Sequence, residues 1–307
     1  MGQTPDALNL PSGWRTRFAP APTGFLHLGH VVNALYVWGV ARANDGRVVL
    51  RIEDHDRSRC RPEYERALLD DLDWLGFVPD EGTTAEFRAG ESPLRQSDND
   101  WRYAAAITAL DLRGLVYPCK CSRGDVARLV TDRPNEEMPY PGTCRTAALA
   151  PDASLQRRVT LDGSRERFFD LRLGPQEQLP SAQCGDLLLR DRLGQWTYQF
   201  AVTVDDLDQK IDVVIRGEDL LASTGRQRAL ARLLGRRRPL QFLHHPLVLK
   251  PGGEKLSKSA GDSGVRELRE AGRTSAEVLG EAAFRAGLID RARPLEQADV
   301  PALFRQG

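Results

Sequence analysis

The alternation of predicted strands and helices constrains the fold of this chain of 307 residues more than any other feature. A short apolar segment at 17–19 is followed, after a turn rich in proline, by a helical pattern over 29–44. A second apolar segment at 48–52 precedes helical patterns over 62–76 and 98–113. Strands that alternate with helices are typical of an α/β domain with a parallel sheet.

This alternation is interrupted once. Residues 116–185 contain prolines, cysteines and short irregular pieces, so we interpret them as an inserted subdomain. Strand and helix patterns return over 186–250, and 251–307 reads as a loop followed by short helices. We therefore predict a Rossmann-like parallel sheet in two halves, 1–115 and 186–250, with an insertion between them and a short helical C-terminal part.

The composition fits a soluble globular enzyme, with 41% hydrophobic and 28% charged residues. No apolar run approaches the roughly 20 residues that span a bilayer. The N-terminal residues also lack the basic and apolar segments of a signal peptide. We therefore expect a cytoplasmic protein that has no membrane partner.

The net charge is zero, so any contact with nucleic acid must use a local basic patch. The densest basic run lies at 226–238 and contains six arginines, Arg226, Arg228, Arg232, Arg236, Arg237 and Arg238. A solvated helix face followed by a charged loop is the simpler interpretation. A patch that contacts phosphates is the alternative.

A first candidate site is the motif His27-Leu28-Gly29-His30, which lies between the first strand and the first helix. Ligands of open α/β sheets bind beyond the carboxyl ends of the strands. The N-terminus of a helix favours phosphate, and both histidines can donate to phosphate oxygens. The alternative is one surface histidine and one histidine that caps the helix.

A second candidate site is Lys255-Leu256-Ser257-Lys258-Ser259, which follows the last predicted strand and two glycines. Two lysines on a loop that can close are able to hold a polyphosphate. Taken alone, this motif is better explained as a solvated surface loop.

Three of the five cysteines, Cys119, Cys121 and Cys144, lie in the predicted insertion. Thiolates this close together in a cytoplasmic protein indicate zinc. Their spacing differs from the common paired C-x-x-C ligands. The alternative is therefore three reduced cysteines in a small hydrophobic subdomain.

Together, the two phosphate-binding candidates resemble the paired signatures of class I aminoacyl-tRNA synthetases. The wider run over 17–30 is similar to the glutamyl branch of this family, as are the blocks at 51–54, 198–206 and 214–220. These blocks occur in the family's order. The resemblance implies the Rossmann-like fold predicted above and the activation of glutamate by ATP, with magnesium accompanying the nucleotide.

A pocket for glutamate needs cations for two carboxylates and an anion for the ammonium group. The family uses the matching positions for this amino acid, which are Arg17, Ala19, Ala21, Glu53, Tyr198 and Arg216. The resemblance assigns ATP to His27, Gly29, His30, Lys255 and Lys258, with His27, His30 and Lys258 acting in catalysis. Taken one at a time, the glutamate-binding candidates could instead form a structural salt bridge or a core tyrosine.

The compact members of this branch provide a more specific comparison. They resemble the segment from Cys119 to Cys144 and use a tyrosine as the fourth ligand, which implies Tyr140 in a structural zinc site with one ion per chain. The chain also ends soon after Ser259, so we expect no anticodon-binding domain.

These features are similar to the glutamyl-Q tRNA(Asp) synthetase family. The resemblance implies that L-glutamate is activated without tRNA and transferred to queuosine in the anticodon of tRNA(Asp), and we expect a monomer. Two alternatives remain. One is a truncated glutamyl-tRNA synthetase that charges a tRNA 3′ end, and the other is a non-catalytic RNA-binding paralogue.

Overall fold

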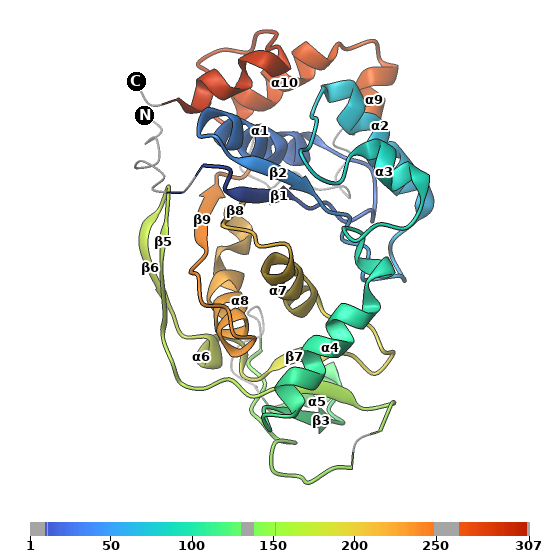
Figure 1. Ribbon diagram of the computed structural model, residues 1–307, viewed down its shortest axis with the longest axis vertical. Coiled ribbons are helices and arrows are strands. Elements are labelled where there is room, and N and C mark those ends of the chain that lie inside the picture. The colour runs from blue at the N-terminus through green and yellow to red at the C-terminus, as the bar shows by residue number, and fades with distance from the viewer. Residues whose placement is uncertain (1–9, 11, 130–137, 151, 249–263, 306–307) are drawn as a thin grey trace.

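The computed structural model describes all residues except 1–9, 11, 130–137, 151, 249–263 and 306–307. Its first half follows the predicted order of elements, and each lies within two residues of the predicted position. These elements are β1 (Arg15–Phe18), α1 (Leu28–Ala43), β2 (Arg47–Leu50), α2 (Pro62–Leu75) and α4 (Asp100–Asp111). Strand β1 pairs with β2 in parallel, as the α/β pattern predicts (Figure 1).

A four-stranded sheet carries the second half of the fold, in the order β6-β5-β9-β8. Its strands are β5 (Glu166–Asp170), β6 (Gly174–Gln178), β8 (Val213–Gly217) and β9 (Gln241–His245). Strand β9 runs parallel to both β5 and β8, whereas β6 is antiparallel to β5. The predicted insertion thus contributes two strands to this sheet, and the domain boundaries themselves remain a prediction.

The two sheets meet edge to edge. The backbone N–H of Asp212 donates to the carbonyl of Arg15 at 2.8 Å, and the Arg15 N–H donates to the Asp212 carboxylate at 3.0 Å. These bonds place β1 beside β8, so the carboxyl ends of β1, β2, β8 and β9 belong to one continuous parallel surface. This edge is where an α/β fold binds its ligands.

Helix α1 is buried on most of its faces, with Val32, Leu35 and Val37 fully buried. It packs between the strands and the C-terminal helices (Figure 1). A helix enclosed in this way needs apolar residues all round and not on one stripe, as its sequence has. The C-terminal part comprises α9 (Val265–Glu270), α10 (Ser275–Arg285) and a 3-10 helix, Gln297–Phe304.

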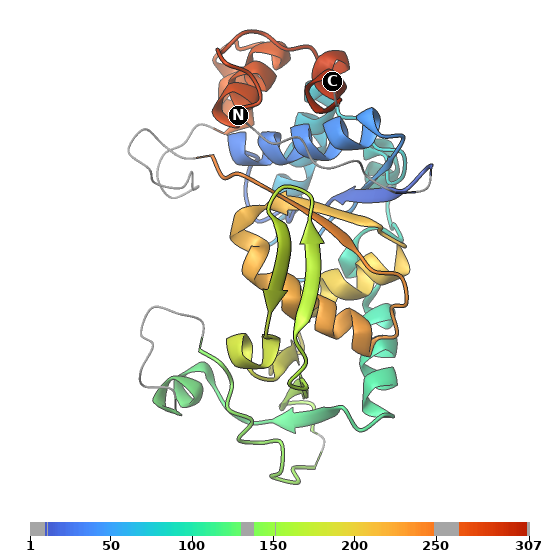
Figure 2. The ribbon, with the colours of Figure 1, turned by 90° about the vertical axis from the view of Figure 1, so that its left-hand side faces the viewer.

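A separate antiparallel sheet forms the far end of the molecule (Figure 2). It contains β3 (Val116–Cys119), β4 (Gln156–Val159) and β7 (Leu187–Arg190), with the short helices α5 (Arg123–Leu129) and α6 (Pro180–Cys184) nearby. The remaining elements are α3 (Thr84–Ala89), α7 (Tyr198–Asp208), α8 (Leu221–Leu233) and 3-10 helices at Gln96–Asp98 and Glu218–Leu220. None of the helices described here has the length and apolar character needed to cross a membrane.

Candidate active site

The two histidines of the first motif cap helix α1. The Nδ1 atom of His27 accepts the N–H of Gly29, and the Nδ1 atom of His30 accepts the N–H of His27, both at 3.1 Å. Their ring centroids are 4.0 Å apart, and both side chains are partly exposed. Because each Nδ1 accepts a backbone proton, a neutral ring carries its own proton on Nε2. Both histidines therefore serve as caps and can also present a donor at the helix N-terminus.

Lys255 and Lys258 lie in 249–263, outside the described residues, but both flanks of that segment are described. Before it, His245 stacks on Tyr36 of α1 with ring centroids 4.9 Å apart. After it, Gly264 forms a β-bridge with His27. The described residues before this segment therefore lie beside α1, and those after it lie beside the histidine motif.

Three of the predicted glutamate-binding residues are charged and buried, but they differ in their partners. Arg17 donates to Asp206 Oδ1 at 3.1 Å, and Glu53 Oε1 accepts from Arg51 at 2.9 Å. Among the described residues, by contrast, no Asp or Glu forms an ion pair with Arg216, which is only 4% exposed. Its guanidinium is held by neutral acceptors, His244 Nε2, Gln227 Oε1 and Thr224 Oγ1, at 2.7–3.1 Å.

The charge of Arg216 is therefore not neutralised within the described part of the chain. Burial lowers its pKa below the ordinary value, as expected for a desolvated cation without an acidic partner. A buried charge is costly unless a counter-ion binds it, so a ligand carboxylate would relieve this cost. Among the described residues of the cluster, Arg216 is therefore the clearest candidate for binding an anion.

Tyr198 joins these charged residues into one cluster. Burial raises the pKa of its hydroxyl, the charge of Glu53 raises it further, and Arg216 and Arg17 oppose the shift. The hydroxyl therefore lies within the electrostatic reach of all three groups, while the side chain keeps partial exposure. The structure thus brings Arg17, Glu53, Tyr198 and Arg216 together.

Ala19 and Ala21 lie next to the same cluster in the chain. They flank Pro20, whose carbonyl accepts the N–H of Glu53 at 3.1 Å, and both alanines are partly exposed. Glu53 Oε2 has no hydrogen-bond partner among the described residues. Glu53 therefore uses one carboxylate oxygen for Arg51, and the other accepts no hydrogen bond from the described residues.

Sequence reasoning missed the acidic residues beneath this cluster. Asp206 Oδ1 accepts hydrogen bonds from both Arg17 and Arg51, the latter at 2.8 Å. Burial alone would raise the pKa of Asp206, but the two arginines lower it below its ordinary value. Asp205 is fully buried and accepts from Gln96, Arg102 and Tyr103. The signal available in the sequence was two adjacent aspartates in a helix that is otherwise largely apolar.

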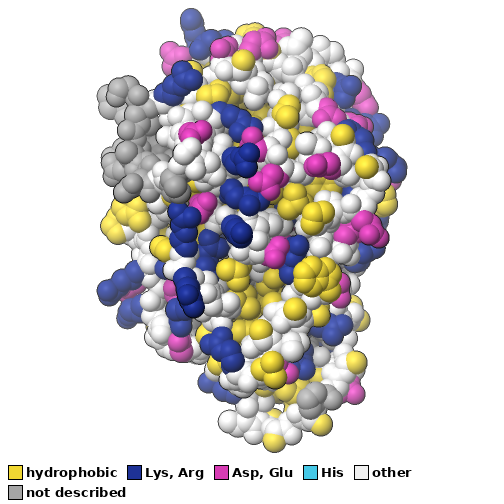
Figure 3. Space-filling view, in the orientation of Figure 1, with side chains coloured by type: hydrophobic (Ala, Val, Ile, Leu, Met, Phe, Trp, Pro, Cys, Tyr) yellow, Lys and Arg dark blue, Asp and Glu magenta, His cyan; other side chains and the backbone are white. Residues whose placement is uncertain are grey.

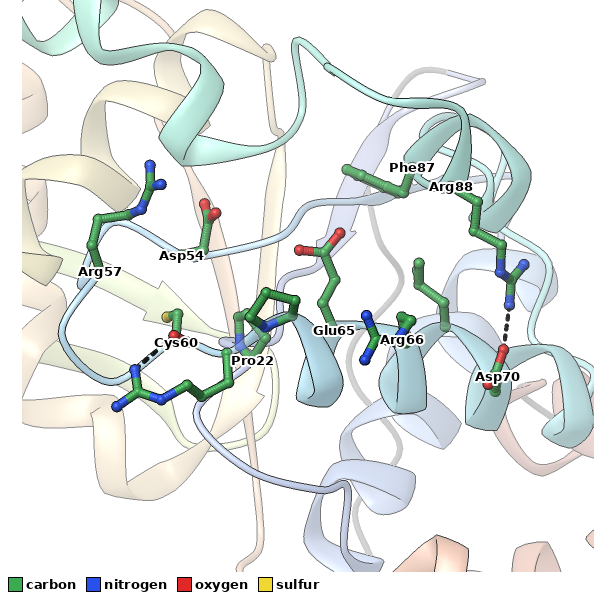
Figure 4. A pocket seen from close by; sticks show the side chains of 12 residues that line it. Pro22, Asp54, Arg57, Cys60, Glu65, Arg66, Asp70, Phe87 and Arg88 are labelled. Carbon is green, nitrogen blue, oxygen red and sulfur yellow. Dashed lines mark hydrogen bonds and ion pairs between the residues drawn. The ribbon is translucent and has the colours of Figure 1, made fainter.

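A pocket of about 630 Å³ opens beside this cluster, between α2 and the loop after β2 (Figure 4). Pro22 and Asp54 line it, and they follow the predicted residues Ala21 and Glu53 in the chain. The pocket contains none of the predicted site residues. Its walls carry charges of both signs, including Arg57 and Arg66 and the acidic Asp54, Glu65 and Asp70 (Figure 4).

The predicted metal centre is a second cluster, located beside β3. The sulfur atoms of Cys119, Cys121 and Cys144 all lie within 4.8 Å of one another. The hydroxyl of Tyr140 is 3.3 Å from Cys119 Sγ and 3.7 Å from Cys121 Sγ. Zinc–sulfur bonds of about 2.3 Å place tetrahedral ligands about 3.8 Å apart, so three sulfurs and this oxygen fit such an ion.

Close backbone packing holds Tyr140 in this position. Its N–H donates to the Cys184 carbonyl at 2.9 Å, and the guanidinium carbon of Arg158 lies 3.8 Å from its ring centroid. Gly185 has a φ of +64°, and a Cβ atom there would lie 2.0 Å from the Tyr140 carbonyl oxygen. Only glycine fits this approach, so Gly185 helps to fix the backbone of Tyr140 beside the three cysteine sulfurs.

The basic run at 226–238 is engaged mainly within the protein. Arg228 and Arg232 pair with Glu166, and Arg232 also pairs with Asp162. Arg236 donates to backbone carbonyls. A band of Lys and Arg side chains crosses the face in Figure 3, with Asp and Glu interspersed. These pairs favour the structural interpretation of the run.

Comparison with known proteins identifies the family of this chain. The family described as "tRNA synthetases class I (E and Q), catalytic domain" matches residues 14–288. The glutamyl-Q tRNA(Asp) synthetase of Symbiobacterium thermophilum is 38% identical over 94% of this chain and 91% of that protein. The Burkholderia cenocepacia (strain J2315) protein of that name is 40% identical over 94% and 93%. The chain belongs to the glutamyl-Q tRNA(Asp) synthetase family.

Solved structures of related synthetases share the fold. A glutamate tRNA ligase from Elizabethkingia meningosepticum, in complex with its amino acid, matches with a TM-score of 0.76 at 25% identity and covers 96% of this chain. The glutamate-tRNA synthetase of Elizabethkingia anophelis matches with a TM-score of 0.75 at 27% identity, over 89% of this chain. The chain spans 65% and 61% of these two proteins, respectively. The predicted family and α/β class I fold are confirmed.

Proposed function

We propose that this protein activates L-glutamate with ATP without requiring tRNA, and transfers the glutamyl group to queuosine in the anticodon of tRNA(Asp). Membership of the glutamyl-Q tRNA(Asp) synthetase family supports the reaction. The observation that carries it in the structure is the buried Arg216, which lacks an acidic partner among the described residues and lies in a cluster with Arg17, Glu53 and Tyr198.

Glutamate matches the charges of this cluster. Arg216 and Arg17 are proposed to bind its carboxylates, and the remaining oxygen of Glu53 its ammonium group. Tyr198 adds a hydroxyl, while Ala19 and Ala21 contribute backbone contacts. Because the charged groups are buried, their interactions with the ligand are stronger than they would be in water.

ATP is proposed to bind at the N-terminus of α1, where His27, Gly29 and His30 face the phosphates. An oxygen of the substrate carboxylate attacks the α-phosphorus, and the bond to the leaving pyrophosphate breaks, which yields glutamyl-adenylate. Such a transfer depends mainly on positioning and charge neutralisation. Lys255 and Lys258 are proposed to stabilise the charge on the phosphates, together with the magnesium that accompanies ATP.

Zinc is proposed to bind Cys119, Cys121, Tyr140 and Cys144 as a structural ion. When bound, it would cross-link the end of β3 to the loop that carries Tyr140 and Cys144 and so stabilise this part of the fold. The hydroxyl position of Tyr140, beside two of the sulfurs, supports it as the fourth ligand. The protein is proposed to act as a monomer.

The decisive experiment is the transfer of labelled glutamate, with ATP, onto purified tRNA(Asp) with and without queuosine, with tRNA(Glu) alongside. Label on queuosine-containing tRNA(Asp) alone is the expected result. Label on the 3′ end of tRNA(Glu) would instead favour a truncated glutamyl-tRNA synthetase. Absence of both transfer and glutamate-dependent ATP–pyrophosphate exchange would favour a non-catalytic paralogue.

A further inference from the structure

A buried chain of hydrogen bonds runs behind Arg216. The Nε–H group of Arg216 donates to His244 Nε2 at 3.1 Å, and His244 Nδ1 lies 2.6 Å from Asp170 Oδ2. Both His244 and Asp170 are fully buried. The three residues come from neighbouring strands β8, β9 and β5, and Arg216 is the register partner of His244. Parallel pairing of these strands therefore brings a carboxylate, an imidazole and a guanidinium into line.

The surroundings of Asp170 determine which nitrogen of His244 carries the proton. Asp170 Oδ1 accepts the backbone N–H groups of Arg172 and Leu173 at 3.0 and 2.9 Å. Oδ2 accepts the backbone N–H of His244 at 3.1 Å. A carboxylate that already accepts three hydrogen bonds is an acceptor toward the ring as well, so the proton is on Nδ1. Nε2 then presents a lone pair to Arg216.

His244 remains neutral in this arrangement. Burial lowers the pKa of its imidazole below the ordinary value, and the hydrogen bond to Asp170 opposes this shift without reversing it. A neutral imidazole can orient a guanidinium without cancelling its charge. An aspartate or glutamate in direct contact would orient Arg216 equally well but would occupy it as a counter-ion.

We propose that Asp170 and His244 are positioning residues that fix the guanidinium of Arg216 and keep its charge available to a carboxylate of the substrate. This role rests on the proposed function, because it requires Arg216 to bind glutamate. Thr224 and Gln227 hold the remainder of the guanidinium through neutral oxygens, which serves the same end. Arg17, in contrast, is neutralised by Asp206, so the two arginines of the site differ in the charge they offer.

The first test reads the tautomer directly and needs no activity. Long-range proton–nitrogen NMR on the labelled whole protein distinguishes the two ring nitrogens, and the chain has only five histidines. The His244→Gln variant identifies the signal by its disappearance. We expect a neutral ring with the proton on Nδ1. A proton on Nε2, or a doubly protonated ring at pH 7.5, would overturn the proposal.

The second test separates positioning from a structural role. Glutamate-dependent ATP–pyrophosphate exchange is measured for wild type, His244→Leu, His244→Gln and Asp170→Asn while glutamate and ATP are varied in turn. Loss of one hydrogen bond to a charged group corresponds to at least about a tenfold change, so His244→Leu should raise the KM for glutamate by that factor. The KM for ATP should stay within about twofold. His244→Gln keeps an acceptor for Arg216 and should restore most of the affinity.

Asp170→Asn is the most specific variant, because its amide can donate to Nδ1 and move the ring proton to Nε2. It should therefore raise the KM for glutamate although its shape is unchanged. Asp71→Asn, a buried change of the same kind on α2, is the matched control and should leave the KM for glutamate unchanged.

An unchanged KM for glutamate in His244→Leu, with wild-type exchange intact, would refute the positioning role alone. Absence of glutamate-dependent exchange in the wild type would instead refute the proposed function. The NMR measurement decides the state of His244 in either case, even if a variant fails to fold.

Discussion

Asp206 is the residue on which the charge balance of the proposed glutamate pocket depends most. It accepts from Arg17 at 3.1 Å and from Arg51 at 2.8 Å, and both arginines are almost completely buried. The Asp206→Asn substitution keeps the shape but removes the negative charge that the two cations share. Arg51 retains Glu53, whereas Arg17 loses the only ion pair it forms among the described residues.

Removing one partner of a buried ion pair typically costs about 3–5 kcal/mol, because the other charge is left buried without compensation. We therefore expect Asp206→Asn to lower the free energy of unfolding at pH 7 by about 3 kcal/mol or more. Glu53 would also be drawn toward the uncompensated arginines, so the KM for glutamate should rise at least about tenfold.

The pH dependence follows from the depressed pKa of Asp206. Its pKa in the folded protein lies below the ordinary value of 3.8, so the carboxylate contributes stability that is fully present above this value. That contribution is lost as the pH falls through the folded pKa. The difference between wild type and Asp206→Asn should thus be constant from pH 5 to 8 and shrink below about pH 4.

Urea unfolding followed by circular dichroism measures the stability, and pyrophosphate exchange measures the KM. Asp162→Asn is the matched control, because Asp162 pairs with Arg232 at the surface and both side chains are about half exposed. Exposed pairs contribute about 0–1 kcal/mol. If Asp206→Asn costs no more than Asp162→Asn, then the buried network does not support the pocket as we describe.

Four further predictions can be checked independently. Burial raises the pKa of Asp71 to about 7, so the free energy of unfolding of the wild type should fall as the pH rises from 4 to 7. In urea unfolding at pH 8, Asp71→Asn should therefore be more stable than the wild type by about 1 kcal/mol or more. Equal pH profiles of the two proteins would contradict this. Tyr140→Phe should reduce zinc retained after dialysis against a weak chelator by about tenfold or more, measured by atomic absorption, if the hydroxyl is a ligand. Gly185→Ala should lower the melting temperature by several degrees, because its Cβ would collide with the Tyr140 backbone, and an unchanged melting temperature would show that this approach can relax. Lys258→Ala should reduce pyrophosphate exchange at least about a hundredfold with the circular dichroism spectrum unchanged; unaltered exchange would show that its assignment is wrong.

Much of this protein is determined locally by its sequence. The alternation of apolar segments and helical patterns is a short-range property, so the positions of α1, α2 and α4 could be predicted within about two residues. The family motifs are also contiguous, which made Arg17 and Arg216 recognisable as candidates for carboxylate binding. Side-chain chemistry alone indicated a metal at the three cysteines.

Tertiary structure alone decided which of these residues are neutralised and which are not. Asp170 lies in the predicted insertion, more than seventy residues from His244, and it reaches that side chain only because β5 pairs with β9. Asp206 lies on helix α7, 189 residues after Arg17 in the chain, and reaches that arginine only in the folded protein. Sequence periodicity records which face of an element is buried, but it carries no information on the partner across the interface. That Arg216 is surrounded by neutral acceptors, with no acidic partner among the described residues, is therefore a property of the folded protein.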